Sequence, residues 1–166
     1  MRASIAFASA VLAGLLIIGA APALAQPVVS HWYFASDGGV LSGQGGSATT
    51  LTAGLGYRFN RYVGIEGGYS GLFDRDASAH GGYVDLYGYI PFDERTRFSM
   101  FGTVGGTYIS TVATGGSFYS ASSSGVRAGG GFEWRIGPRW AIRAAARYQS
   151  LIANSVVGSV GFSVQF

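Results

Sequence analysis

Apolar and polar residues alternate along much of the chain after residue 29. Within 139–151, Trp140 and Ile142 occupy even-numbered positions, whereas Arg143 and Arg147 occupy odd-numbered ones. Residues that are both even or both odd are said below to share a parity. Successive side chains of a β-strand point to opposite faces, so a period of two predicts strands with one apolar and one polar face. The same alternation is present over 49–59, 124–136 and 155–166.

Eight strands are expected from this pattern, at about 30–40, 49–59, 62–71, 81–92, 97–109, 124–136, 139–151 and 155–166. Short turns at 60–61, 93–96 and 137–138 alternate with longer polar segments such as 43–47 and 117–124. Short turns on one side and long loops on the other are typical of an outer-membrane barrel, whose short turns face the periplasm. The pattern therefore predicts an all-β fold, an eight-stranded antiparallel up-and-down transmembrane β-barrel.

The orientation of the two strand faces separates a membrane barrel from a soluble one. In a soluble β-sandwich the apolar face points inward, whereas in a transmembrane barrel it points to lipid. The face opposite the apolar one mixes Gly, Ala and Ser with a few charged residues, which suits a narrow lumen. A soluble lipocalin-like carrier, with the aromatic residues in its core, is the alternative.

Aromatic residues concentrate at the strand ends beside the short turns, where a membrane-interface girdle is expected. They are Tyr57, Phe59, Tyr62, Phe92, Phe98, Trp134, Trp140 and Phe166. Three tyrosines, Tyr69, Tyr108 and Tyr148, are candidates for the opposite girdle.

The first 25 residues have the layout of a secretory signal peptide. Arg2 gives a positive start, an apolar stretch follows over 5–20, and residues 23–25 match the small-x-small pattern that signal peptidase cleaves. We therefore expect a signal peptide at 1–25, a mature chain beginning at Gln26, and a barrel domain over 26–166. An uncleaved anchor helix is the alternative, because the apolar stretch is nearly long enough to span a membrane.

Composition narrows the function classes. There is no Cys, so the exported domain does not depend on disulfides. The net charge is only +3 and Lys is absent, which argues against the dense basic face of a nucleic-acid-binding protein. After residue 26 no segment is long and apolar enough for a membrane helix, so a helical inner-membrane protein is not expected.

The polar strand face carries charged residues that would point into the barrel. They are Arg58, Glu66, Asp85, Arg127, Glu133, Arg143 and Arg147, together with Arg135. In an eight-strand ring, Glu66 and Arg143 are expected to meet across the lumen, and Glu133 and Arg143 to be neighbours across a hairpin. Charges in a narrow lumen must be paired or hydrated, so these residues predict a structural plug of ion pairs. A small-ion gate, in which the pairs rearrange, is the alternative.

Several motifs resemble a known family. They are Leu55-Gly56-Tyr57-Arg58-Phe59-Asn60, Gly64-Ile65-Glu66-Gly67-Gly68-Tyr69, residues 129–135 followed by Trp140 and 146–148, and the terminal segment 160–166. In this order they resemble the small eight-stranded outer-membrane barrels of the OmpA-like type, including the opacity and surface-antigen proteins of the porin family. The resemblance implies an outer-membrane location, and insertion by the barrel-insertion machinery, which reads the terminal strand ending at Phe166.

No catalytic, metal or cofactor site is expected. A lipid-modifying hydrolase would need a His near a Ser and a carboxylate. His31 lies near the mature N-terminus, and His80 lies in a predicted loop near Ser78 and Asp74, outside the strand context of such enzymes. Asp74, Asp76, Asp93 and Glu94 are scattered loop carboxylates, which are usually solvated. The glycines at 129–131 fall inside a strand and form no phosphate loop.

Two function classes remain open at this stage. The first is a structural or surface-interaction barrel, with roles in envelope integrity, adhesion or contact with outer-membrane lipid and lipopolysaccharide. The second is a narrow porin-like channel for small ions or solutes. An eight-stranded barrel has an interior that side chains just fill, so we do not expect a large, steady pore.

Overall fold

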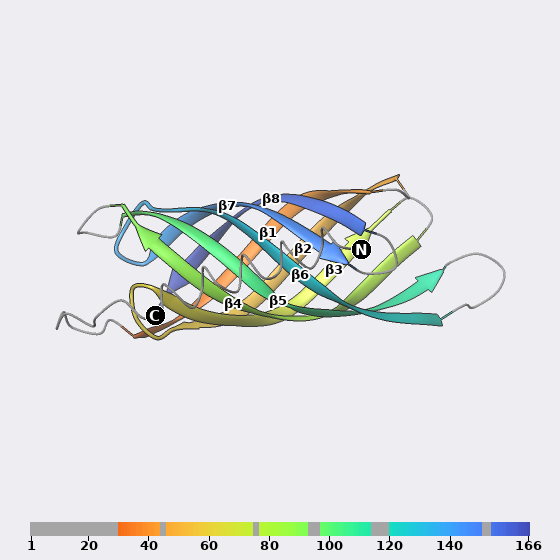
Figure 1. The fold of residues 1–166 in the computed structure, drawn as a ribbon, viewed down its shortest axis with the longest axis horizontal. Coiled ribbons are helices and arrows are strands. Elements are labelled where there is room, and N and C mark those ends of the chain that lie inside the picture. The colour runs from red at the N-terminus through yellow and green to blue at the C-terminus, as the bar shows by residue number, and fades with distance from the viewer. Residues whose placement is uncertain (1–29, 44–45, 75–76, 93–96, 114–119, 151–153) are drawn as a thin grey trace, which may run out of the picture.

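The computed structural model describes residues 30–43, 46–74, 77–92, 97–113, 120–150 and 154–166. They form eight strands that run in chain order around a closed antiparallel barrel (Figure 1). The strands are β1 (His31–Gly43), β2 (Gly46–Arg58), β3 (Val63–Phe73), β4 (Ala77–Pro91), β5 (Phe98–Ala113), β6 (Ser120–Arg135), β7 (Trp140–Ser150) and β8 (Asn154–Gln165). The predicted fold class is confirmed. The signal peptide predicted over 1–25 lies outside the described residues.

The strand pairing is staggered around the ring. Following paired residues once around the barrel from His31 leads back to Leu41 in β1, ten residues further along the strand. Such a stagger goes with strands tilted by about 35–45° and an interior just wide enough for side chains to fill. Because β8 pairs with β1, the backbone polar groups of the strands bond within the ring, as a passage through lipid requires.

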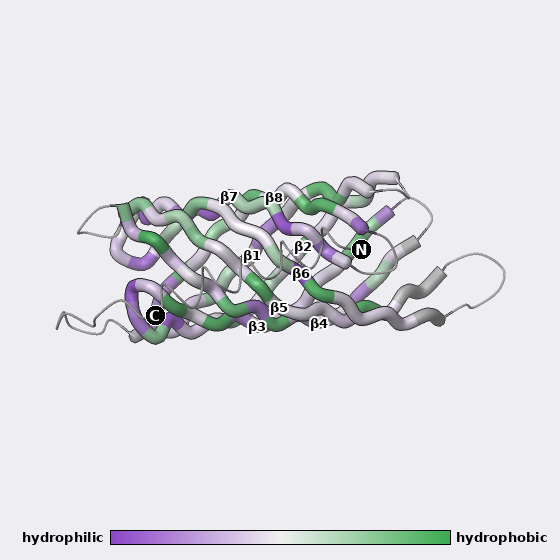
Figure 2. Tube along the Cα trace, in the orientation of Figure 1, coloured by the Kyte–Doolittle hydropathy of each residue, from purple (hydrophilic) through white to green (hydrophobic). Residues whose placement is uncertain are grey.

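Side chains alternate between the lumen and the outer surface, as the sequence pattern predicts. In β2, Thr50, Thr52 and Arg58 are buried, whereas Leu51 and Leu55 are about half exposed. Apolar and polar segments interleave along the strands in Figure 2. The apolar face therefore lies outside the barrel and the polar face inside, which is the inverted arrangement of a membrane barrel.

The exposed apolar residues form a band of membrane thickness. On β8, Val156, Val160 and Phe162 are exposed, and Phe166 beyond its end is exposed too. Ten residues separate Val156 from Phe166, and at about 3.4 Å per residue with a tilt of about 45° they cover about 24 Å across the bilayer. This agrees with the apolar band of about 25 Å seen in transmembrane barrels. Among the described residues, no helix has the length and apolar character needed to cross a membrane.

At the loop end the strands continue further than the sequence predicted. β1 and β2 stay paired up to Gly43 and Gly46, so the predicted 43–47 loop is largely strand. Likewise β6 begins at Ser120, within the predicted 117–124 loop. These segments are rich in Gly and Ser and lack apolar alternation. They extend the backbone ladder past the apolar band, where both faces tolerate water, and the prediction of loops at 43–47 and 120–124 is wrong. Residues 114–119 lie outside the described residues.

The turn between β2 and β3 is longer than the two-residue hairpin predicted at 60–61. β2 ends at Arg58 and β3 begins at Val63. The Asn60 side-chain oxygen accepts hydrogen bonds from the backbone N–H groups of Tyr62 (2.7 Å) and Val63 (2.9 Å). An Asn side chain commonly stabilises a turn by accepting from the backbone two residues further on.

Gly131 in β6 lies tightly against β7. A Cβ at this position would be 2.0 Å from the Ala144 carbonyl oxygen and 2.8 Å from the Ala145 Cα. We expect Gly131→Ala to lower the free energy of unfolding by about 1–3 kcal/mol, because backbone must shift to admit the methyl group. Gly158→Ala is the matched control, since nothing lies within 4 Å of its Cβ position. Urea unfolding in lipid vesicles measures both costs, and equal costs would contradict the prediction.

Candidate functional site in the barrel lumen

Among the described residues, four fully buried arginine–carboxylate ion pairs lie in the lumen. They join Arg143 to Glu66 at 2.8 Å, Arg58 to Glu133 at 2.9 Å, Arg127 to Asp85 at 3.2 Å, and Arg147 to Asp37 at 3.4 Å. None of these eight side chains is more than 4% exposed. Four positive charges thus face four negative ones, which is the condition under which buried charges are tolerated.

Glu66 is the centre of a hydrogen-bond cluster that joins opposite walls of the barrel. One carboxylate oxygen accepts from Arg143, and the other accepts from the hydroxyl groups of Tyr83 (2.9 Å) and Tyr87 (3.2 Å). Arg143 also donates to the Tyr87 hydroxyl oxygen at 2.7 Å. Side chains from β3, β4 and β7 are therefore tied together in the interior.

A second cluster joins β1, β7 and β8. Arg147 donates to Ser159 Oγ at 3.1 Å and to Asp37 Oδ2 at 3.4 Å. It also donates to the Tyr87 hydroxyl oxygen at 3.4 Å, so Tyr87 connects the two clusters. The contacts of Arg147 are longer than those of Arg143, which makes this cluster the looser of the two.

A small polar pocket opens beside the second cluster. Its volume is about 10 Å³, and its wall includes Asp37, Thr50, Arg127, Arg147 and Gln149. A space of this size holds about one water molecule. It is a recess in the plug and not an open pore.

Aromatic rings fill the lumen beside the ion pairs. Tyr87, Tyr89 and Phe101 are buried, and their ring centroids lie 5.5–6.0 Å apart. The Arg58 guanidinium lies 3.7 Å from the Tyr89 ring centroid, and the Arg127 guanidinium lies 4.3 Å from that of Tyr83. These cation–π contacts hold the guanidinium groups in place and add to the attraction of the ion pairs.

The structure brings together most of the charged residues singled out from the sequence. All seven lie buried in the lumen, and Arg135 lies at its edge with its Nε 3.9 Å from Glu133. Glu133 and Arg143 are partners in the β6–β7 register, yet their charged groups pair elsewhere, with Arg58 and Glu66 respectively.

Sequence reasoning missed two parts of this site. Asp37 was not singled out, although it shares its parity in β1 with the buried Tyr33 and Ala35. The lumen tyrosines were missed because aromatic residues were assigned only to the outer girdles. The parity that Tyr83 and Tyr87 share with the buried Asp85 was the available signal.

The sequence model described as outer membrane protein beta-barrel domain matches residues 10–166. The chain belongs to this family. Similar solved structures include Neisserial surface protein A, with a TM-score of 0.66, 17% identity, and coverage of 82% of this chain and 97% of that chain. The N-terminal β-barrel of Pseudomonas aeruginosa OprF gives a TM-score of 0.66, 12% identity, and coverage of 81% and 97%. Ail, the attachment invasion locus protein of Yersinia pestis, gives a TM-score of 0.57 and 17% identity, with coverage of 82% of this chain and 97% of that chain. No curated protein sequence matches the chain.

Membership of this family indicates that the protein is located in the outer membrane. The solved structures are all below 25% identity, so they show a shared fold and nothing about a shared ligand.

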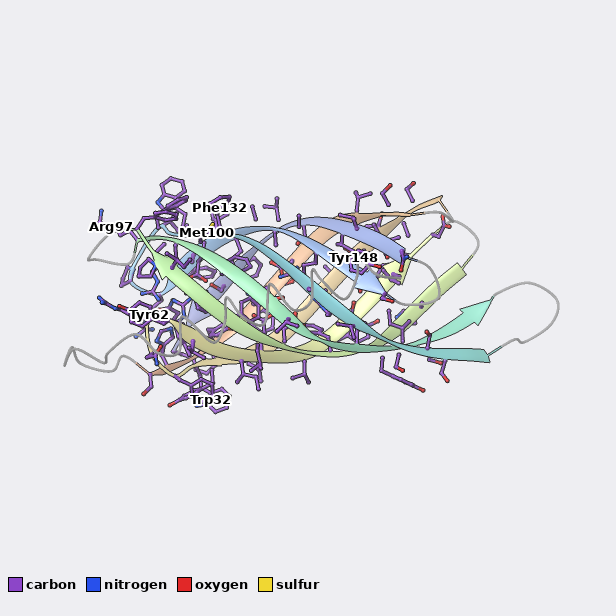
Figure 3. The ribbon with its side chains drawn as sticks, in the orientation of Figure 1. Trp32, Tyr62, Arg97, Met100, Phe132 and Tyr148 are labelled. Atoms are coloured by element: carbon purple, nitrogen blue, oxygen red, sulfur yellow. The ribbon has the colours of Figure 1, made fainter. Side chains whose placement is uncertain are left out.

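The predicted aromatic girdle lies at the end of the barrel with the short turns, where Figure 3 shows Trp32 projecting from the outer wall and Tyr62 at the same end. Its exposed members are Phe59, Phe92, Phe98, Trp134, Trp140 and Phe166, whereas Tyr57 and Tyr62 are half-buried. Trp32 belongs to the same girdle and was not predicted; it is 53% exposed and its ring centroid lies 5.0 Å from that of Tyr57. Tyr148 lies toward the other end, and Tyr69 and Tyr108 are exposed.

The sequence analysis placed His80 in a loop, and this prediction is wrong. His80 is part of β4 and pairs with Gly71 of β3. Its ring stacks on Tyr69, whose hydroxyl contacts Nδ1, and meets the edge of Phe73 at 5.7 Å. His80 therefore belongs to an aromatic cluster on the outer wall. His31 is half-buried at the start of β1.

Of the carboxylates considered for a cation, Asp74 is exposed between β3 and β4. Asp76, Asp93 and Glu94 lie outside the described residues. Within the part of the chain that the structure describes, no three His, Cys, Asp or Glu side chains are grouped to hold a metal ion.

The hydroxyl group of Tyr87 connects Glu66, Arg143 and Arg147. We expect Tyr87→Phe to cost about 1–3 kcal/mol in the free energy of unfolding, because charged groups lose a buried partner. Tyr33→Phe is the control, since the buried Tyr33 hydroxyl makes no hydrogen bond, and its cost should be close to zero. Urea unfolding of the two variants in the same lipid measures both costs. A Tyr33→Phe cost as large as that of Tyr87→Phe would contradict the connecting role of the Tyr87 hydroxyl.

Proposed function

We propose that this outer-membrane barrel is a structural and surface-interaction protein whose lumen is sealed by ion pairs. The observation that carries the proposal is the balance of four buried arginines against four buried carboxylates. A permeant ion would have to replace contacts of 2.8–3.4 Å between desolvated charges, and breaking a buried pair is strongly unfavourable.

The tight packing of the interior supports the same conclusion. Tyr87, Tyr89 and Phe101 occupy the space between the charged groups, and each is at most 2% exposed. A general porin has a wider barrel with a water-filled channel, whereas eight strands enclose only a side-chain core. The polar strand extensions at the loop end, such as β6 from Ser120, are the surface available to partners or lipopolysaccharide.

Planar-bilayer recording of the purified monomer tests the sealed lumen. We expect no stable open level, and only brief, small events, with a wide trimeric porin in the same bilayer as the positive control. Liposome swelling with small sugars should likewise show no uptake above that of empty liposomes. A high and steady monomer conductance would overturn the proposal.

A narrow channel for small ions is the second candidate, and a specific observation favours it. The Arg147–Asp37 pair is the longest of the four, at 3.4 Å, and it borders the polar pocket. Opening at this cluster would need the least loss of contact. If the channel operates, Asp37→Asn raises the frequency of conducting events while Glu133→Gln, at the more tightly paired Arg58, does not.

Export and membrane assembly complete the proposal. The signal peptide at 1–25 directs export, and the exposed Phe166 after β8 is read by the barrel-insertion machinery. No catalytic role is part of the proposal, and among the described residues His80 is held in an aromatic cluster on the outer wall. Membrane fractionation with a heat-dependent gel shift tests the assembly, and a lipid A deacylation assay tests the absence of catalysis.

A further inference from the structure

Three rings gather on the outer wall of the barrel toward the loop end. Tyr69 and Phe73 come from β3, and His80 comes from β4, where it pairs with Gly71 of β3. The imidazole stacks on the Tyr69 ring at a centroid distance of 6.0 Å and meets the edge of the Phe73 ring at 5.7 Å. The Tyr69 hydroxyl also contacts His80 Nδ1. An interface girdle needs only apolar or amphipathic rings, so a girdle alone does not account for this tethered imidazole.

Gly71 leaves room for the three rings to meet. It shares its parity with Tyr69 and Phe73 and therefore faces outward, yet it is buried. A Cβ at this position would lie 2.9 Å from two carbons of the Phe73 ring and 3.3 Å from one carbon of the Tyr69 ring. The two rings thus close over Gly71, directly opposite His80. The cluster is a packed unit and not a set of independent surface side chains.

On the side toward β5 the cluster is open. Tyr69 pairs with Gly82 of β4, and Gly82 pairs with Tyr108 of β5. Tyr69 and Tyr108 are 44% and 55% exposed. A Cβ at Gly82 would lie 3.5 Å from its nearest neighbour, the Gly68 carbonyl oxygen. No side chain therefore stands between the two tyrosines at this level, and a ligand ring can lie against them above Gly82.

The cluster lies at the outer interface of the membrane. Ten residues separate His80 from Ile90, which is 43% exposed on the same face of β4 at the short-turn end. At about 3.4 Å per residue and a tilt of about 45° they cover about 24 Å, which is the height of the apolar band. The loop end of such a barrel faces outside, where lipopolysaccharide forms the outer leaflet. His80 is therefore level with the sugar and phosphate headgroups of that lipid.

The described carboxylates of β3 and β4 point away from the cluster. Glu66 and Asp85 are buried in the lumen. Asp74, which follows Phe73, continues the parity of Glu66 and of the buried Ser70. Neither strand, as far as the structure describes it, thus places a negative charge beside the imidazole that would repel a phosphate.

We infer that Tyr69, His80 and Tyr108 bind the phosphorylated glucosamine headgroup of lipopolysaccharide. The exposed tyrosine rings pack against the apolar C–H face of a sugar ring above Gly82, with their hydroxyl groups toward water. When the Tyr69 hydroxyl donates to Nδ1, the imidazole carries its hydrogen on Nε2 and donates it to a phosphate or sugar oxygen. The inference rests on the proposed surface-interaction function and names one lipid ligand for it, and it does not depend on whether the lumen conducts.

Binding of lipid A, the phosphorylated glucosamine anchor of lipopolysaccharide, tests this inference. The full mature chain, folded in detergent micelles, is titrated with purified lipid A, and native mass spectrometry measures the fraction of protein that carries one lipid. Phosphatidylethanolamine is titrated in the same way as the comparison lipid. We expect lipid A to bind more tightly than phosphatidylethanolamine. His80→Phe keeps a ring but removes the N–H donor, and it should weaken lipid A binding about fivefold, as for the loss of one hydrogen bond.

Two further variants separate the geometry of the cluster from the folding of the barrel. Gly71→Ala pushes against the outer ends of the Phe73 and Tyr69 rings and not against backbone, so it should weaken lipid A binding in a folded barrel. Tyr148→Phe is the matched control, because it removes a hydroxyl group that donates to Asn154 Oδ1 on the outer wall at β7 and leaves the cluster intact. It should leave lipid A binding unchanged. Retention of the heat-dependent gel shift shows that each variant is folded.

The ¹⁵N resonance of His80 Nε2 gives a readout that a purely structural role would not move. The chain has two histidines, so the His80 signal is assigned by its loss in His80→Phe. We expect lipid A to shift this resonance and phosphatidylethanolamine to leave it in place.

Three results would overturn the inference. The first is equal lipid A binding by the wild type and folded His80→Phe. The second is equal binding of lipid A and phosphatidylethanolamine by the wild type. The third is a shift of the Nε2 resonance with phosphatidylethanolamine as large as that with lipid A, which would make the cluster an ordinary interface girdle. A high, steady monomer conductance together with intact lipid A preference would instead overturn the sealed lumen and support the lipid site.

Discussion

Replacing Glu66 by Leu is expected to lower the free energy of unfolding by about 3–5 kcal/mol. Glu66 is 1% exposed and accepts hydrogen bonds from three side chains, of which Arg143 is the closest at 2.8 Å. Without the carboxylate, Arg143 stays buried as a charge whose remaining short contact is the Tyr87 hydroxyl. An uncompensated buried charge is the source of the cost.

The matched experiment is a double-mutant cycle. Arg143→Met should be similarly costly, because it strands the Glu66 carboxylate. The double variant Glu66→Leu with Arg143→Met removes both charges, and we expect it to cost much less than the sum of the two. Urea unfolding in phospholipid vesicles, followed by tryptophan fluorescence, gives the four free energies. Additive costs would show that the pair is not coupled and would remove the physical basis of the sealed lumen.

Much of the barrel could be predicted from the sequence because a membrane-spanning barrel requires a regular alternation of lipid-facing and lumen-facing residues. Eight strands and an outward apolar face follow from a period of two, and closure follows from the need to pair backbone groups in lipid. The inward position of Arg143 and Arg147 follows from parity alone. Register does not, because the ten-residue stagger around the ring arises from the geometry of closure and leaves no local mark in the sequence.

The wrong predictions share one cause. Residue types were interpreted without regard to where each residue lies relative to the membrane. Gly43 and Ser120 look like loop residues, yet they extend strands beyond the apolar band, where hydrogen bonding alone maintains the ladder. Tyr87 is of a residue type typical of a membrane-interface girdle, yet its position in the alternation places its side chain in the lumen. There it hydrogen-bonds to Glu66 and Arg143. Which carboxylate pairs with which arginine depends on side-chain reach across the lumen, and sequence spacing carries no information on it.

Leu86 gives the most direct test that the apolar face meets lipid. It is 48% exposed on β4, four residues from Ile90 at the short-turn end and four from Gly82, whose β5 partner is the exposed Tyr108, a candidate for the opposite girdle. Leu86 thus lies near the middle of the band. We expect Leu86→Arg to lower the free energy of unfolding by about 2–4 kcal/mol, as for an arginine at the bilayer midplane.

Ile90→Arg is the matched control, since Ile90 is apolar, 43% exposed, and on the same face of the same strand. Near the interface the same change should cost only about 0–1 kcal/mol, because the guanidinium reaches the headgroups. On a water-facing surface both changes would stay within about 0.5 kcal/mol. Equal costs at the two positions would therefore contradict the membrane orientation, whereas a cost that rises with depth requires a lipid-facing outer wall and, with it, a lumen that must hold its own charges in balance.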